Sequence, residues 1–229
     1  MEIENRDEIG VLGETVNTMV QGLYERFQLS KFVSSSTIDS LSGKKDGVKE
    51  SVTLFFSDIR SFTAYSEKKT PEEVVVNLNK ILAFQTRIIH ENGGDVDKYV
   101  GDEIVAIFSG ENKEINACRS ALVIQKELTE KSPEFYDGLT VGIGINTGEV
   151  ILGMIGSEER ADFTVIGDHV NYASRLCDAA KAGEVIISES VYRNLNGKIE
   201  VSRPYKIKVK GKEKFHRVYL LSPLKDGGV

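Results

Sequence analysis

The chain has 229 residues, of which 40% are hydrophobic and 28% are charged, so it can form one large domain and is not a disordered or repetitive chain. Its 29 basic and 35 acidic side chains give a formal net charge of −6, so binding to nucleic acid or to an anionic lipid surface is not expected. The two cysteines, Cys118 and Cys177, form no metal-binding spacing and favour a reducing, cytoplasmic compartment. No apolar run approaches the ~20 residues of a membrane span, so we expect this chain not to enter a bilayer.

Residues 1–40 are predicted to form one long amphipathic helix. Its apolar residues recur at steps of three and four, which is coiled-coil spacing, at Ile9, Leu12, Val16, Met19, Leu23 and Phe27. Because such a stripe must be buried, its simplest partner is the same helix of a second copy. The alternative is that the helix folds back on its own domain. The turn-rich residues 41–49 are predicted to be a linker.

Residues 50–222 are predicted to form the compact domain, followed by a tail over residues 223–229. Strands are expected over 52–56 (buried mainly on one face), 96–99, 104–108, 139–145, 149–154 and 185–187, with two more within 201–221. Helices are expected from Pro71 to the stop at Gly93, over 114–130 and from Asp168 to about 182, with Thr70 as N-cap of the first. Asn146-Thr147-Gly148 is expected to turn the strand 139–145 into the next.

This order of elements predicts an α+β fold with a ferredoxin-like split βαβ core and extra strands. The sheet is expected to be mixed or antiparallel, with the helices largely on one face.

Two aspartates are expected at strand ends. Asp58 follows the first strand of the domain, and Asp102 occupies the tip of a predicted hairpin. Paired carboxylates in a chain without a His/Cys cluster suit Mg²⁺ or Mn²⁺, usually completed by the phosphates of a substrate. The alternative is that each aspartate is only a turn residue.

Two sets of polar residues are candidates for holding a nucleotide. Asn171 and Arg175 are four residues apart on one predicted helix face, where an amide and a guanidinium can hold ribose and phosphate oxygens. Lys210, Lys212 and Lys214 form either a basic rim for a polyphosphate or the exposed positions of an edge hairpin. These residues predict a metal-dependent enzyme acting on a nucleotide phosphate, unless the polar pair is merely solvated.

Four ordered segments resemble the class III nucleotidyl cyclase catalytic domain, in particular the bicarbonate-responsive group of bacterial adenylyl cyclases. They are residues 55–63 (FFSDIRSFT), 98–102 (KYVGD), 156–176 and 209–212 (VKGK). The resemblance extends over about residues 50–222, and four motifs in order are far more specific than one.

The resemblance implies a role for each matching residue. Asp58, the Ile59 carbonyl and Asp102 would bind two divalent ions, Mg²⁺ or Mn²⁺. The other implied roles are base recognition by Lys98 and Thr164, substrate contacts by Phe62 and Thr63, ribose orientation by Asn171, α-phosphate charge stabilisation by Arg175, and terminal-phosphate binding by Lys210. The implied reaction is attack of the ribose 3′-oxygen on the α-phosphorus of ATP, giving cyclic AMP and pyrophosphate.

The resemblance also implies a homodimer, because sites of this family are shared between two chains. Asp7-Glu8-Ile9-Gly10 with the residues after it resembles the end of a HAMP signalling module, so we expect the cytoplasmic output part of a longer membrane-bound receptor. Thr164, where many relatives have Asp, marks the bicarbonate-responsive group and makes bicarbonate a candidate activator. Ser61 replaces a frequent Gly of the metal loop.

Three alternatives stay open. A guanylyl cyclase is disfavoured because Lys98 suits adenine N1, whereas guanylyl cyclases typically have Glu at that position. Residues 100–104 also resemble the turn of diguanylate cyclases, but that family does not have the signature from Thr164 to Arg175. A dimerising or sensing module without catalysis is disfavoured because all the expected catalytic residue types are present.

Overall fold

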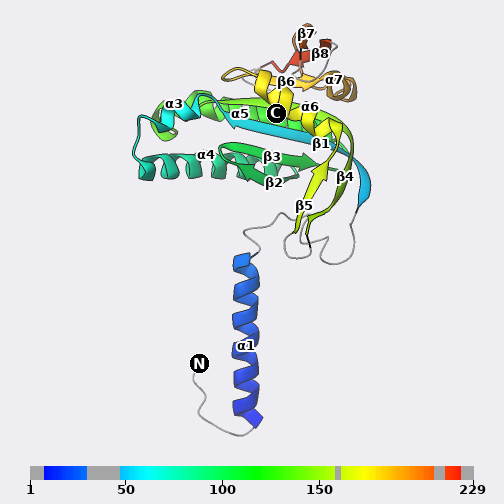
Figure 1. Ribbon diagram of the computed structural model, residues 1–229. Helices are drawn as coiled ribbons and strands as arrows, with labels where there is room; N and C mark the ends of the chain where they lie inside the picture. Colours follow the sequence, from blue (N-terminus) through cyan, green and yellow to red (C-terminus); the bar gives the residue numbers. More distant parts are fainter. Residues whose placement is uncertain (1–7, 30–46, 158–160, 209–214, 223–229) are drawn as a thin grey trace.

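The computed structural model describes residues 8–29, 47–157, 161–208 and 215–222 and confirms an α+β fold (Figure 1). The helices are α1 (Glu8–Leu29), α3 (Phe62–Ser66), α4 (Pro71–Glu91), α5 (Lys113–Phe135), α6 (Asp168–Ala179) and α7 (Glu189–Asn194). The strands are β1 (Val48–Ile59), β2 (Gly94–Val100), β3 (Glu103–Phe108), β4 (Val141–Gly156), β5 (Ala161–Ile166), β6 (Val185–Ser188), β7 (Tyr205–Lys208) and β8 (Phe215–Leu220). The elements α3, β5 and α7 were not expected from the sequence.

The strands form one mixed sheet in the order β2-β3-β1-β4-β6-β8-β7, and β5 pairs with β4. Within the order β2-β3-β1-β4 each strand pairs antiparallel with the next, and this is the strand order of a ferredoxin-like core. Strand β6 joins β4 in parallel, and β8 and β7 continue the sheet antiparallel. The predicted split βαβ core with added strands is therefore present.

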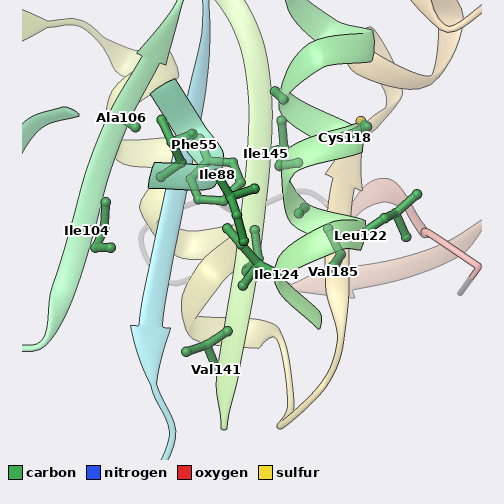
Figure 2. Close-up of a cluster of buried hydrophobic side chains, with 14 of the residues drawn as sticks. Phe55, Ile88, Ile104, Ala106, Cys118, Leu122, Ile124, Val141, Ile145 and Val185 are labelled. Carbon is green, nitrogen blue, oxygen red and sulfur yellow. The ribbon is translucent and has the colours of Figure 1, made fainter. Parts of the chain in front are cut away.

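Most helices cover one face of the sheet, as expected from the sequence, and α6 covers the other face. On one face, Phe55 of β1 belongs to a cluster with Ile88 of α4 and Ile124 of α5 (Figure 2). On the other face, Leu54 packs in a cluster with Ala173 and Cys177 of α6. Strand β1 is buried on both faces from Val52 to Phe56, so each face needs an apolar cover.

Strand β4 runs without a turn through Asn146, Thr147 and Gly148, contrary to the sequence-based expectation. It pairs with β1 continuously, from Val48 opposite Leu152 to Ile59 opposite Val141. The polar side chains of the expected turn are instead bonded inside the fold. Asn146 Nδ2 donates to the His169 carbonyl at 3.0 Å, and Thr147 Oγ1 donates to the Val52 carbonyl at 3.1 Å.

The N-terminus of α4 matches the prediction from sequence. Thr70 is its N-cap and Pro71 its first residue, and a reciprocal pair of hydrogen bonds between Thr70 and Glu73 forms a capping box. In both bonds a side-chain oxygen accepts from a backbone N–H group that has no partner within the helix.

Helix α1 exposes a row of large apolar side chains: Val11, Leu12, Val16, Met19, Val20, Leu23, Tyr24 and Phe27. They include the predicted seam from Leu12 to Phe27, whereas the Ile9 side chain lies outside the described part of the chain. The pairing of this helix with a second copy stays a prediction. In the described ranges, no helix combines the length and the apolar character needed to cross a bilayer.

Candidate active site

The two predicted metal-binding carboxylates lie together at one end of the sheet. Because β1 and β3 are antiparallel with Asp58 opposite Glu103, the turn residue Asp102 comes next to Asp58. Gly101 makes that turn with a φ of +64°, which favours glycine. Burial, together with the charge of Asp58 and a hydrogen bond to it, raises the pKa of Asp102 to about 6.

Two further charged residues surround this pair, and sequence reasoning assigned a role to neither. The Arg60 guanidinium forms an ion pair with the Asp58 carboxylate and donates to the Asp58 carbonyl at 3.1 Å and the Ala180 carbonyl at 3.4 Å. Burial first, and the charge of Asp58 second, raise the pKa of Glu103 to about 7. Arg60 lies inside the quoted motif, but nothing in the motif indicates that it ties β1 to the end of α6.

This donor set fits hard divalent cations such as Mg²⁺ or Mn²⁺. Two adjacent carboxylates and a backbone carbonyl are oxygen donors, which both ions prefer. Burial first, and the charge of Asp58 second, raise the pKa of Asp102 to about 6, and a cation between the two carboxylates would relieve their repulsion. Within the described residues, no group of three or more His, Cys, Asp or Glu side chains is placed to hold a metal ion, so phosphate oxygens or water would complete the coordination.

The segment after Asp58 bends sharply into α3. Ser61 has a φ of +60°, in the left-handed region, which explains why glycine is frequent there in the family it resembles. The Ile59 side chain is buried in the core, so only its backbone can serve a ligand. The rings of Phe62 and Tyr65 are stacked, with 6.1 Å between their centroids. Thr63 is exposed, and its carbonyl accepts a hydrogen bond from the Glu67 backbone N–H.

The two predicted base-recognition residues are in direct contact. Lys98 Nζ of β2 donates to Thr164 Oγ1 of β5 at 2.5 Å, although the residues are 66 positions apart in sequence. Pairing of β5 with β4 brings Thr164 opposite Gly153 and toward the end of β2. An ammonium and a hydroxyl side by side can bind two adjacent polar atoms of a nucleobase edge.

A third residue, Asp97, joins this pair and was missed by sequence reasoning. Its side chain is 1% exposed, and Oδ2 lies 3.3 Å from Lys98 Nζ and 3.3 Å from Thr164 Oγ1. Burial raises the pKa of Asp97, and the Lys98 charge opposes this shift. Strict alternation along a strand would put Asp97 and Lys98 on opposite faces, so the sequence pattern carried no signal for the contact.

The remaining predicted residues lie on α6 or outside the described ranges. Asn171 is exposed, and Arg175, one turn further along α6, forms an exposed ion pair with Asp178 at 3.0 Å. Lys210, the predicted terminal-phosphate ligand, falls outside the part of the chain that the structure describes.

Known proteins match both the sequence and the fold. Residues 45–222 match the adenylate and guanylate cyclase catalytic domain. An adenylate cyclase of Anabaena cylindrica is 36% identical over 241 residues, covering 93% of this chain and 48% of its own length. The crystal structure of the adenylyl cyclase CyaB from P. aeruginosa has a TM-score of 0.73 at 31% identity, covering 78% of this chain and 97% of that one.

Guanylyl cyclases are structurally similar as well. The crystal structure of the guanylyl cyclase Cya2 also has a TM-score of 0.73, at 29% identity, covering 80% of this chain and 96% of that one. The overall fold therefore does not distinguish adenine from guanine as the base. The chain spans about half the length of the curated Anabaena relative.

Proposed function

The chain belongs to the adenylate and guanylate cyclase catalytic domain family, and on this premise we propose that it is an adenylyl cyclase that converts ATP to 3′,5′-cyclic AMP and pyrophosphate. The observation that carries the choice of ATP is the contact between Lys98 Nζ and Thr164 Oγ1. Adenine offers an acceptor at N1 beside a donor at N6, and a lysine beside a hydroxyl oxygen offers the complementary donor and acceptor.

The reaction forms one bond and breaks another at the α-phosphorus. The ribose 3′-oxygen attacks, its proton passes to solvent, and the bond from the α-phosphorus to the bridging oxygen breaks to release pyrophosphate. No covalent intermediate with the protein is needed, so the chain contributes positioning and charge stabilisation.

In the proposal, residues of β1, of the turn between β2 and β3 and of α6 share this work. Asp58 and Asp102, with the Ile59 carbonyl, hold the divalent ions; when bound, Mg²⁺ or Mn²⁺ supplies Lewis-acid stabilisation of charge on the phosphate oxygens. Asn171 orients the ribose, and the Arg175 guanidinium faces the charge that develops on the α-phosphate. The ion pair between Arg175 and Asp178 is exposed and therefore weak. Breaking it so that Arg175 can bind a phosphate instead costs little free energy.

We infer that two chains share each site, with the carboxylates from one chain and the residues Lys98, Thr164, Asn171 and Arg175 from the other. The exposed apolar row of α1 supports a dimer, because a helix with such a row is normally buried against a partner. A two-fold axis would then give two equivalent sites.

Mixing two inactive variants tests the shared site. Asp58→Asn and Arg175→Ala should each abolish cyclic AMP formation. After the two chains are mixed and exchange partners, half the dimers should be hybrids with one intact site, which restores about a quarter of the wild-type activity. A mixture that stays inactive, although an affinity tag on one variant co-purifies the other and so demonstrates hybrid dimers, would show that each chain carries a complete site.

The substrate is tested with the unaltered chain. Purified protein is incubated with ATP or GTP and with Mg²⁺ or Mn²⁺ across a protein concentration series. Cyclic AMP formation that stops on chelation and rises in specific activity as the chain dimerises is the expected result. Higher steady-state activity with GTP than with ATP would favour a guanylyl cyclase, and no product at dimeric concentrations would favour a module without catalysis.

Regulation is part of the same proposal. Thr164 supports bicarbonate as an activator, which the assay tests by adding bicarbonate at constant pH and ionic strength. The HAMP-like residues from Asp7 onward support a role as the cytoplasmic output domain of a membrane-bound receptor.

A further inference from the structure

A β-bulge brings Asp97 onto the face of β2 that carries Lys98. The pairing of β2 with β3 shifts register between Val96, opposite Ala106, and Lys98, opposite Val105, so Asp97 is an extra residue on β2. Val96 packs against the cluster that α4 and α5 cover, and Tyr99 contacts Thr86 of α4. Asp97 and Lys98 both contact Thr164 instead.

The bulge leaves a buried carboxylate with one oxygen that is satisfied and one that is not. Oδ2 contacts both Lys98 and Thr164, whereas Oδ1 is buried without a hydrogen-bond partner among the described residues. Leaving a buried carboxylate oxygen unpaired costs free energy, so this side chain is retained against a penalty. Because this carboxylate contacts both Lys98 and Thr164, we expect it to act on base recognition.

The three groups determine the direction of each hydrogen bond. An ammonium group only donates, so Thr164 Oγ1 must accept from Lys98. A carboxylate only accepts, so the single Thr164 hydroxyl proton goes to Asp97 Oδ2. Thr164 therefore has no proton left for a ligand and can only accept, while the ammonium of Lys98 has a hydrogen left to donate.

We propose that Asp97 is a positioning residue that sets nucleobase specificity by holding the proton of the Thr164 hydroxyl, so that this hydroxyl accepts from the adenine amine and rejects the guanine carbonyl. This inference rests on the proposed base-recognition role of Lys98 and Thr164. Guanine would set its O6 acceptor against the Thr164 acceptor and its N1–H donor against the Lys98 donor. Without the carboxylate, the Thr164 hydroxyl can rotate and donate to guanine O6.

The test compares kcat/KM for ATP with kcat/KM for GTP in the full chain. Asp97→Ala and Asp97→Val, whose branched side chain suits a strand, both remove the acceptor, and each is expected to lower the ATP-to-GTP ratio about tenfold or more. Asp97→Asn is expected to keep most of the ratio, because its amide oxygen can still accept from Thr164 and Lys98. Tyr99→Phe, a neighbour whose hydroxyl contacts α4, is the control and should leave the ratio unchanged.

A double-mutant cycle separates this role from a structural one. Thr164→Val should lower the ratio by itself, and adding Asp97→Ala to it should lower the ratio no further. An Asp97→Ala variant, folded by circular dichroism, that loses activity equally with both nucleotides at an unchanged ratio would overturn the inference.

The ratio of the affinities for ATP and GTP is measured separately, by displacement of a fluorescent nucleotide with non-reactive ATP and GTP analogues. If the wild-type chain forms neither cyclic nucleotide, the proposed function fails. The role of Asp97 is then decided by whether Asp97→Ala changes the binding ratio.

Discussion

The contact between α6 and β4 is so close that one added methyl group should weaken the fold. A Cβ on Gly144 would lie 2.2 Å from the Cys177 backbone nitrogen and 2.7 Å from the Ala173 carbonyl oxygen, whereas ordinary contact begins near 3.4 Å. Both atoms belong to the backbone of α6, so no side-chain rotation relieves the clash and the helix would move by about 1 Å. Overpacking costs ~1–3 kcal/mol, and a backbone shift puts Gly144→Ala at about 3 kcal/mol or more.

Gly148 in the same strand provides a matched comparison. A Cβ there would lie 2.4 Å from His169 Cγ and Nδ1, so the clash is with a side chain. Gly148→Ala alone should also destabilise by about 2–3 kcal/mol, but Gly148→Ala with His169→Ala should be as stable as His169→Ala alone. Removing the Ala173 methyl group should not rescue Gly144→Ala, because the clashing atoms are backbone.

Urea unfolding followed by circular dichroism measures each variant by linear extrapolation. A loss of 3 kcal/mol corresponds to a fall in Tm of roughly 6–12 °C for a domain of this size. A loss below about 1 kcal/mol for Gly144→Ala, or a Gly148→Ala variant that His169→Ala fails to rescue, would refute the close approach of α6 to β4.

Three other outcomes are expected. Ser61→Gly should stabilise the fold by up to about 1 kcal/mol in the same urea assay, because Ser61 has a φ of +60°, and a loss of stability would contradict that backbone conformation. Burial raises the pKa of both thiols, Cys118 and Cys177, so a thiol reagent at pH 8 should modify them only after unfolding, and prompt reaction of the folded chain would contradict their burial. Met19→Glu with Leu23→Glu should put charges on the exposed apolar row of α1 and shift sedimentation toward the monomer, with unchanged sedimentation arguing against pairing through this helix.

The sequence predicted the parts of the fold that depend on local chemistry. Thr70 and Pro71 predicted the start of α4, because an N-cap side chain and a fixed φ act within one helical turn. Asp58 and Asp102 were expected at strand ends, and the antiparallel pairing of β1 with β3 brings them together. Ordered motifs also indicated the family, which the match over residues 45–222 confirmed.

Predictions failed where a contact distant in sequence replaced a local preference. Asn146, Thr147 and Gly148 form a good turn in isolation, but continuous pairing with β1 and the bonds of Asn146 to His169 keep β4 extended. Likewise, the first strand was expected to be buried mainly on one face. In the structure its second face is buried as well, because Ala173 and Cys177 of α6 pack there.

The sequence by itself therefore determined the family, the start of α4 and the types of residue at the candidate site, because short-range chemistry and motif order are encoded locally. Only the tertiary structure decided which side chains meet. The register shift between Val96 and Lys98 depends on how β2 pairs with β3, and it turns Asp97 toward Thr164, 67 positions away. Strand register is a property of two paired strands, so the pattern within one strand cannot contain it.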